Sequence, residues 1–209
     1  KDNKAIFDSP FGLPDTFLFK NYLIAWTEGR MGTYFLNSVI ISVSVIVLTV
    51  FIASMAAFAL SRFNLKFKSI ILLFFLTGLM VPRHTILVPL AYIIGVLKLK
   101  NNLFALILLY VAFALPFSIV VLQVFMKRLN NSIIEAAIID GAGYFRIYYS
   151  IVLPMTIPAI STISIFNFLG AWNDILFPLI IINDNNLKPI ALGLLNFNGE
   201  RGSQYGPLM

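Results

Sequence analysis

Long stretches of uncharged, apolar residues alternate with short charged segments along this chain. The longest, from Tyr34 to Ser61, runs for 28 residues without a charged side chain. About 20 apolar residues are enough to cross the hydrocarbon core of a membrane as a helix. Four stretches meet this length: 34–61, 69–97 with Arg83 and His84 within it, 102–126, and 156–182 with Asp174 in its second half. The pattern predicts an all-α, polytopic transmembrane helical bundle with at least four spans visible.

The two ends of the chain differ from this apolar middle. Residues 1–33 carry eight charged side chains together with Pro10, Gly12 and Pro14, and residues 183–209 are rich in Asn and Gly. Such turn-forming segments predict aqueous loops. We therefore expect a membrane domain at 34–182 between two extracytoplasmic loops, 1–33 and 183–209, with a cytoplasmic loop at about 128–155.

The composition agrees with a membrane protein. Hydrophobic residues make up 59% of the chain and charged residues 11%, whereas soluble domains carry about 25% charged residues. This argues against a soluble globular domain, a nucleic-acid binder and a disordered tail. The chain has no Cys, which excludes disulfides and zinc–thiolate sites. It also lacks a GxxxxGK[ST] phosphate loop and a catalytic set, so we expect a non-catalytic subunit without metal or cofactor.

The orientation follows from Lys and Arg near the helix ends. The segments at 62–68 and 127–150 hold six of these cations within a short length, and the remaining loops hold eight spread over much longer segments. Because positive charges close to the helix ends mark the cytoplasmic side, the two short segments are predicted to lie inside the cell.

The loop at 130–143 carries the strongest local signal. Ser132, followed by Glu135 three residues later, has the pattern of a capping box, and Gly141 or Gly143 suits a left-handed helix end. The sequence predicts a short helix at about 132–140 whose apolar face is formed by Ile133, Ile134, Ala137 and Ile138. A short amphipathic helix of this kind docks on a partner or lies on lipid head groups.

The same loop resembles a known family signature. Glu135-Ala136-Ala137, Asp140-Gly141-Ala142 and Leu153-Pro154 resemble the EAA motif of binding-protein-dependent ABC importer permeases. The carbohydrate branch, and its maltose-type G subunit in particular, is similar over nearly the whole chain: Phe19-Lys20-Asn21-Tyr22, Asn37-Ser38, Ala56-Ala57-Phe58-Ala59-Leu60-Ser61-Arg62, Pro82, Val88-Pro89-Leu90, Trp172-Asn173-Asp174, Leu192-Gly193-Leu194 and Asn196-Phe197. The family usually has Pro at the position of Asn130 and an acidic residue at that of Ser132.

The resemblance implies an assembly and a mechanism. The chain would be a permease subunit of an ATP-driven sugar importer in the cytoplasmic (inner) membrane of a bacterium. Its partners would be a second permease in a heterodimer, two ATP-binding subunits and an extracytoplasmic sugar-binding protein. The residues that couple it to the ATPase would be Glu135, Ala136, Ala137, Asp140 and Gly141. Family members have six spans, so we expect the sequence to be a fragment that begins after the first span and stops as the sixth begins.

The sugar path has three tentative candidates. Asn167, Trp172 and Asp174 belong to the last apolar stretch, and a carboxylate or an aromatic face suits a hydroxylated ring. The alternatives are a helix–helix hydrogen bond for Asn167 and an anchor at the membrane interface for Trp172 and Asp174.

A stripe of small residues in the first span predicts a face packed against protein: Ser38, Ser42, Thr49, Ala53, Ala57 and Ser61.

Two other functions remain open. The chain could be the permease for a different solute, such as a polyol, glycerol phosphate or oligopeptide. It could also be a proton-coupled secondary transporter that uses Asp174, His84 and Arg83.

Overall fold

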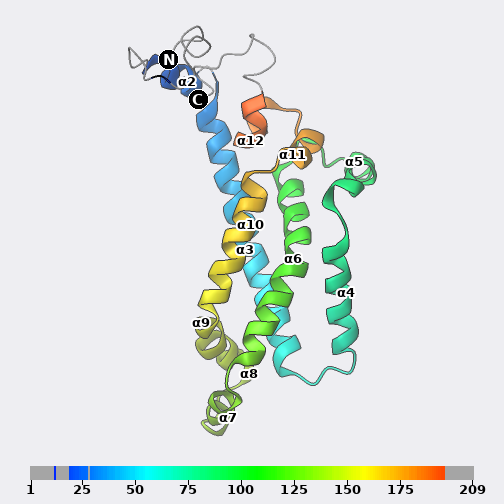
Figure 1. Cartoon of the computed structure of the whole chain (residues 1–209), viewed down its shortest axis with the longest axis vertical. Helices are drawn as coiled ribbons and strands as arrows, with labels where there is room; N and C mark the ends of the chain where they lie inside the picture. Colours follow the sequence, from blue (N-terminus) through cyan, green and yellow to red (C-terminus); the bar gives the residue numbers. More distant parts are fainter. Residues whose placement is uncertain (1–11, 13–18, 28, 196–209) are drawn as a thin grey trace. The chain divides into compact units, whose positions relative to one another are not determined.

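The computed structural model describes residues 12, 19–27 and 29–195. Every regular element in this part of the chain is a helix, which confirms the predicted all-α fold (Figure 1). The residues divide into two compact units. Unit 1 takes its described residues from 1–41, 90–106 and 171–209, and unit 2 comprises 42–89 and 107–170.

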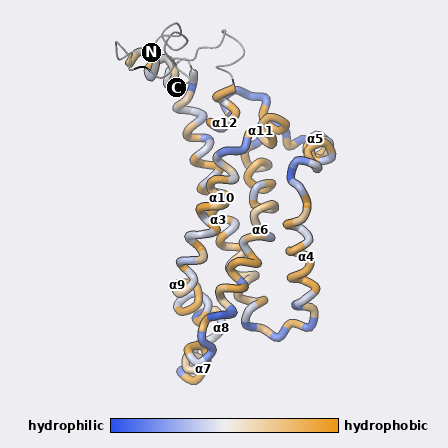
Figure 2. The backbone as a smooth tube through the Cα atoms, in the orientation of Figure 1, coloured by the Kyte–Doolittle hydropathy of each residue, from blue (hydrophilic) through white to orange (hydrophobic). Residues whose placement is uncertain are grey.

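Unit 2 contains most of the membrane helices and the loop with the EAA pattern. Its elements are the greater part of α3 (Met31–Arg62), α4 (Lys68–Met80), η1 (Arg83–Ile86), most of α6 (Leu103–Arg128), α7 (Asn131–Ile139), α8 (Tyr144–Ile147), the π-helical η2 (Tyr148–Val152), α9 (Leu153–Met155) and most of α10 (Ile157–Trp172). Figure 2 shows that the long helices are mainly hydrophobic and that hydrophilic positions cluster at the turns.

Two of the four predicted spans are single helices. Helices α3 and α6 are long and apolar enough to cross a membrane. They confirm the stretches 34–61 and 102–126, although α3 begins three residues earlier, at Met31. Counting each bent helix pair as one span gives up to four spans in the described part of the chain.

The other two apolar stretches are interrupted. The helix at Lys68–Met80 ends where Val81 adopts an extended conformation before Pro82, because a residue that precedes proline is disfavoured in the helical region. Between Tyr144–Met155 and Ile157–Trp172 the chain bends by 72°. Thr156 lies at this bend with ψ near zero. The apolar stretch 69–97 is thus not a single helix, because it breaks at Val81 and Pro82, but the two helices together still count as one possible bent span.

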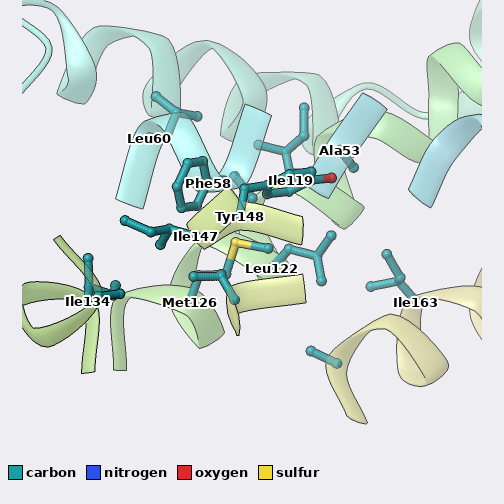
Figure 3. Close-up of a cluster of buried hydrophobic side chains, with 14 residues drawn as sticks. Ala53, Phe58, Leu60, Ile119, Leu122, Met126, Ile134, Ile147, Tyr148 and Ile163 are labelled. Atoms are coloured by element: carbon teal, nitrogen blue, oxygen red, sulfur yellow. The ribbon is translucent and has the colours of Figure 1, made fainter. Parts of the chain in front are cut away.

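The core of unit 2 is one apolar cluster that joins all its long helices (Figure 3). Ala53 and Ala57 of α3 are fully buried, as are Leu122 and Met126 of α6 and Ile163 of α10. Small side chains on α3 let the neighbouring helices approach closely. The predicted packed stripe is confirmed, since Ser38, Ser42, Thr49, Ala53 and Ala57 are buried and Ser61 is half-buried.

Unit 1 contains α2 (Lys20–Thr27), the first residues of α3, most of α5 (Leu87–Val96), α11 (Leu176–Ile181), η3 (Asn185–Leu187) and α12 (Ile190–Gly193). Polar side chains hold the segment after α11 against α3. Asn37 Nδ2 donates to the carbonyl oxygens of Asn186 (2.8 Å) and Lys188 (3.0 Å), and Ser38 Oγ accepts from the backbone N–H of Ile190 (2.8 Å).

The predicted loops are more ordered than expected where the structure describes them. Residues 20–27 form a helix inside the predicted loop 1–33, and residues 183–195 contain η3 and α12 inside the predicted loop 183–209. Buried Leu192 and Gly193 anchor α12. Residues 196–209, which include the Asn196-Phe197 pair of the family resemblance, lie outside the described part of the chain.

Candidate functional site

The EAA loop folds as the predicted short helix, with a different N-cap. Helix α7 spans Asn131–Ile139, and the side chain of Asn130 accepts a hydrogen bond from the backbone N–H of Ser132 (3.0 Å). Asn130 is thus the N-cap, and the prediction of a capping box based on Ser132 is wrong. Because Asn is among the best N-cap residues, it can start the helix where the family usually has Pro.

The C-terminal end of α7 depends on Gly141. Its φ is +79°, in the left-handed region that glycine enters without a Cβ penalty. The N–H of Gly141 donates to the carbonyl of Ile138 and the N–H of Ala142 to that of Ala137, both at 2.9 Å. These two bonds form a Schellman motif, which satisfies carbonyl groups that a helix end leaves unpaired. The predicted left-handed stop at Gly141 is confirmed.

Only one narrow side of α7 packs on the rest of unit 2. Ile134 and Ala137 are buried and belong to the core cluster, in which Figure 3 shows Ile134 near Met126. Ile133 and Ile138, predicted on the same apolar face, are exposed. A spacing of three residues places Ile134 and Ala137 one above the other, so they alone point inward.

The remaining side of α7 and the start of α8 expose large apolar side chains. Ile139 is 85% exposed and Phe145 77% exposed, and Ile138 and Tyr144 are exposed beside them in the sequence. We call these four residues the EAA-loop apolar set. The helix end that carries them also bears exposed Asp140. Large exposed apolar groups next to charged ones are typical of surfaces that bind another protein.

The five predicted coupling residues do not all occupy the same environment. Glu135, Ala136, Asp140 and Gly141 are exposed, and Ala137 is buried against unit 2. A partner can therefore contact the first four, whereas Ala137 attaches the helix to its own subunit. Ala137 is small enough to let α7 pack closely there.

The three predicted pathway residues fall in different units and have local structural contacts. Asn167, in unit 2, is buried and donates from Nδ2 to Ser118 Oγ (3.1 Å) on α6. Trp172, in unit 1, packs edge-on against Phe35 at a ring-centroid distance of 5.7 Å. Their roles in the sugar path stay predictions.

Asp174 does not lie within a helical span as predicted. Helix α10 ends at Trp172 and α11 begins at Leu176, so Asp174 lies in the break between them. Its two carboxylate oxygens accept hydrogen bonds from the backbone N–H groups of Leu176 (3.2 Å) and Phe177 (3.3 Å). The predicted fourth span at 156–182 is therefore two helices, and the Asp174 carboxylate binds the first two backbone N–H groups of the second one.

The sequence alone did not reveal a contact between two residues at the base of the EAA loop. The sequence marks Arg62 only as a cation near a helix end and as part of a family motif, yet its guanidinium donates hydrogen bonds to Asn131, to the Met126 carbonyl in the last turn of α6 and to the Leu129 carbonyl after it. Asn131 was read only as part of the loop. No local pattern could have paired them, since they lie 69 positions apart.

Of the residues of the proton-coupled alternative, Arg83 and His84 are exposed and Asp174 is half-buried. Arg83 and His84 form the start of η1, and the Arg83 guanidinium lies over the Phe113 ring at 5.8 Å. In the described part of the chain, no group of three or more His, Cys, Asp or Glu side chains could hold a metal ion.

Comparisons with known proteins identify the family. Residues 49–207 match the model of the family described as "Binding-protein-dependent transport system inner membrane component". The chain is 41% identical to the diacetylchitobiose uptake system permease protein NgcG of Streptomyces coelicolor, with 100% of this chain and 70% of that protein aligned. It is 37% identical to the probable ABC transporter permease protein YurM of Bacillus subtilis, over 100% of this chain and 69% of that protein.

The fold has a counterpart among solved structures. A bacterial ABC transporter involved in the import of the acidic polysaccharide alginate matches with a TM-score of 0.82 at 18% identity, over 94% of this chain and 74% of that chain. This likeness concerns the fold alone. The family match and the alignment of this whole chain to NgcG together show that this chain belongs to the inner membrane components of binding-protein-dependent transport systems.

Proposed function

We propose that this chain is a permease subunit of an ATP-driven sugar importer in the bacterial cytoplasmic membrane. The observation that carries the proposal is the similarity of this whole chain to NgcG, a diacetylchitobiose permease. A second relative, 34% identical, belongs to a multiple sugar-binding transport system of Streptococcus mutans. Because both relatives are named for sugar uptake, we favour a sugar over a polyol, glycerol phosphate or oligopeptide.

The proposed partners are a second permease, two ATP-binding subunits and an extracytoplasmic sugar-binding protein. The sugar path would lie between the two permeases. Asn167, Trp172 and Asp174 remain our candidates for residues that line it. The loops at 62–68 and 127–155 would face the cytoplasm, and residues 183–209 would face the binding protein.

The ATPase contact is assigned to the exposed side of α7. Ile139 and Phe145 present apolar surface that the described part of this chain leaves exposed. Ala136 lies on the exposed side as well, and its methyl group lets a partner approach the helix closely. When the ATP-binding subunits close on ATP, they would move α7 and thereby shift the permease between its inward-open and outward-open forms.

The coupling role requires that α7 move as a unit with the helices behind it. The Asn130 cap and the Gly141 motif keep the two ends of α7 helical, and the buried Ile134 and Ala137 attach its middle to the core of unit 2. A short helix that keeps its shape and is packed on the core can transmit a push to the helices behind it.

Transport by the reconstituted complex tests this proposal. The chain, its partner permease and the ATPase are assembled in proteoliposomes with the binding protein, and uptake of labelled diacetylchitobiose and other oligosaccharides is measured with and without ATP. We expect uptake that needs both ATP and the binding protein. Uptake by this chain alone, driven by a proton gradient, would instead support the secondary-transporter alternative.

Cross-linking tests the ATPase contact in the same complex. Because the chain has no Cys, a single Cys can be placed at exposed Ala136, with buried Ala137 as the matched control. We expect a cross-link to the ATPase from position 136 and a much weaker one from position 137. The absence of any cross-link from position 136 in a transport-competent complex would contradict the proposed contact.

A further inference from the structure

One guanidinium joins three separate helix ends at the base of the EAA loop. Arg62 is the last residue of α3. Its Nη2 donates to the carbonyl oxygens of Met126 (2.6 Å) and Leu129 (3.2 Å), and its Nη1 donates to Asn131 Oδ1. Met126 lies in the last turn of α6, and Asn131 is the first residue of α7. The end of α3 is therefore tied to the end of α6 and to the start of α7.

The carbonyl contacts explain why a cation is placed here. The last four carbonyl groups of a helix have no partner within that helix, and they form the negative end of its dipole. The Arg62 guanidinium caps one such carbonyl of α6 and also the Leu129 carbonyl of the turn that follows. These two hydrogen bonds to carbonyl groups are ordinary helix capping, which a cation can provide at the end of any helix.

The contact with Asn131 goes beyond capping. Only Leu129 and Asn130 separate α6 from α7. The Nη1 bond links the start of α7 directly to α3. Because the guanidinium is a rigid planar fork with several donors, it can hold all three acceptors in one geometry, which a Lys ammonium on a flexible stem cannot do.

We propose that Arg62 is a positioning residue that transmits the displacement of α7 to α3. When the partner moves α7, the Arg62–Asn131 bond transmits the movement to the end of α3. The ends of α3 and α6 then move together. The inference deepens the proposed function and rests on it, since it assumes that α7 is the element that the ATPase moves. It assigns no contact between Arg62 and the ATPase or the sugar.

The decisive variant is Asn131→Ala in the full complex. This change removes the bond to α7 and leaves the two carbonyl bonds of Arg62 in place. The ATP hydrolysed per sugar transported should rise about tenfold, the loss expected for one charge-assisted hydrogen bond, at an unchanged amount of assembled complex. Arg62→Gln should raise it at least as much and Arg62→Lys less. Lys127→Gln, which changes an exposed cation in the last turn of α6, is the control and should leave the ratio unaltered.

A second readout does not depend on the sugar. In the wild-type complex, ATP binding should change the hydrogen exchange of the last turn of α3, which includes the Phe63 N–H bonded to the Ala59 carbonyl. This change should be lost in Asn131→Ala and kept in Asn131→Asp, because the carboxylate retains an acceptor for Arg62.

The outcomes separate the two proposals. A wild-type complex without ATP-dependent sugar uptake would refute the proposed function. An active wild-type complex in which Asn131→Ala leaves both the coupling ratio and the ATP-induced exchange of α3 unchanged would overturn the role of Arg62. If Arg62→Gln fails to assemble, the Asn131→Ala and Asn131→Asp pair still decides.

Discussion

Replacing Gly141 by Ala should loosen the last turn of α7 through the backbone alone. The φ of Gly141 is +79°, and a Cβ added there would meet no atom within 4 Å. No steric clash therefore contributes, and the whole cost comes from placing a Cβ in the left-handed region. That cost is about 1–2 kcal/mol for one residue.

The cost is borne by the helix end rather than by the whole subunit. The two backbone bonds that Gly141 permits, from Gly141 N–H to Ile138 and from Ala142 N–H to Ala137, would open more often. A loss of about 1–2 kcal/mol corresponds to roughly 5–30-fold more frequent opening. Local openings of this kind are observed directly as amide hydrogen exchange.

The assay is hydrogen exchange of the 138–144 peptide in the purified complex. We expect Gly141→Ala to exchange roughly 5–30-fold faster at these amides. Gly141→Asn should lie in between, because Asn adopts the left-handed conformation more readily than Ala.

Gly143 provides the matched control. It lies two residues away, also has open space around a would-be Cβ, and has a φ of −71° that any residue adopts. Gly143→Ala should leave the exchange rate unchanged. Equal exchange rates in Gly141→Ala and Gly143→Ala would refute the argument that backbone conformation sets the stability of this turn.

Two further predictions concern unit 1. Gly193→Ala should lower the stability of the subunit by about 1–3 kcal/mol, as expected for overpacking, because a Cβ there would come within 2.1 Å of Tyr34 Cδ2; the thermal midpoint of the complex measures this, and Tyr34→Ala should weaken the effect if the clash is its cause. Asp174→Asn should keep the amount of assembled complex close to that of the wild type, since the Asn side-chain oxygen can still accept one of the two backbone hydrogen bonds, and should lower transport per complex. Unchanged transport for every sugar tested would make Asp174 a cap and not a pathway residue.

The EAA loop shows which features can be predicted from local sequence patterns and which cannot. The short helix, its glycine stop and its exposed position next to a basic helix end are all encoded within a few residues of Asn130 to Gly143. The N-cap was assigned to Ser132 because Ser followed by Glu135 fits a general rule. The structure uses Asn130, whose side chain reaches the Ser132 N–H, and two residues with similar capping ability cannot be separated by sequence preference.

The division of α7 into two sides was only half predictable. Periodicity grouped Ile133, Ile134, Ala137 and Ile138 as one apolar face. The structure buries Ile134 and Ala137 and exposes the other two, because the body of unit 2 touches the helix along a single narrow line. Hydrophobicity could not reveal this, since a surface that binds a partner is as apolar as one that packs inside.

The sequence alone determined the membrane class, the two long spans and the family. These follow from uninterrupted apolar length and from short motifs, which need no knowledge of distant neighbours. The tertiary structure decided where the other two apolar stretches break, that Asp174 caps a helix, and that Arg62 holds Asn131. The contact of Arg62 with Asn131 depends on packing, because the two residues lie 69 positions apart. The break before Pro82 and the hydrogen bonds of Asp174 are local and interrupt otherwise apolar stretches. In apolar helices with little amphipathic pattern, the sequence does not encode which groups will meet.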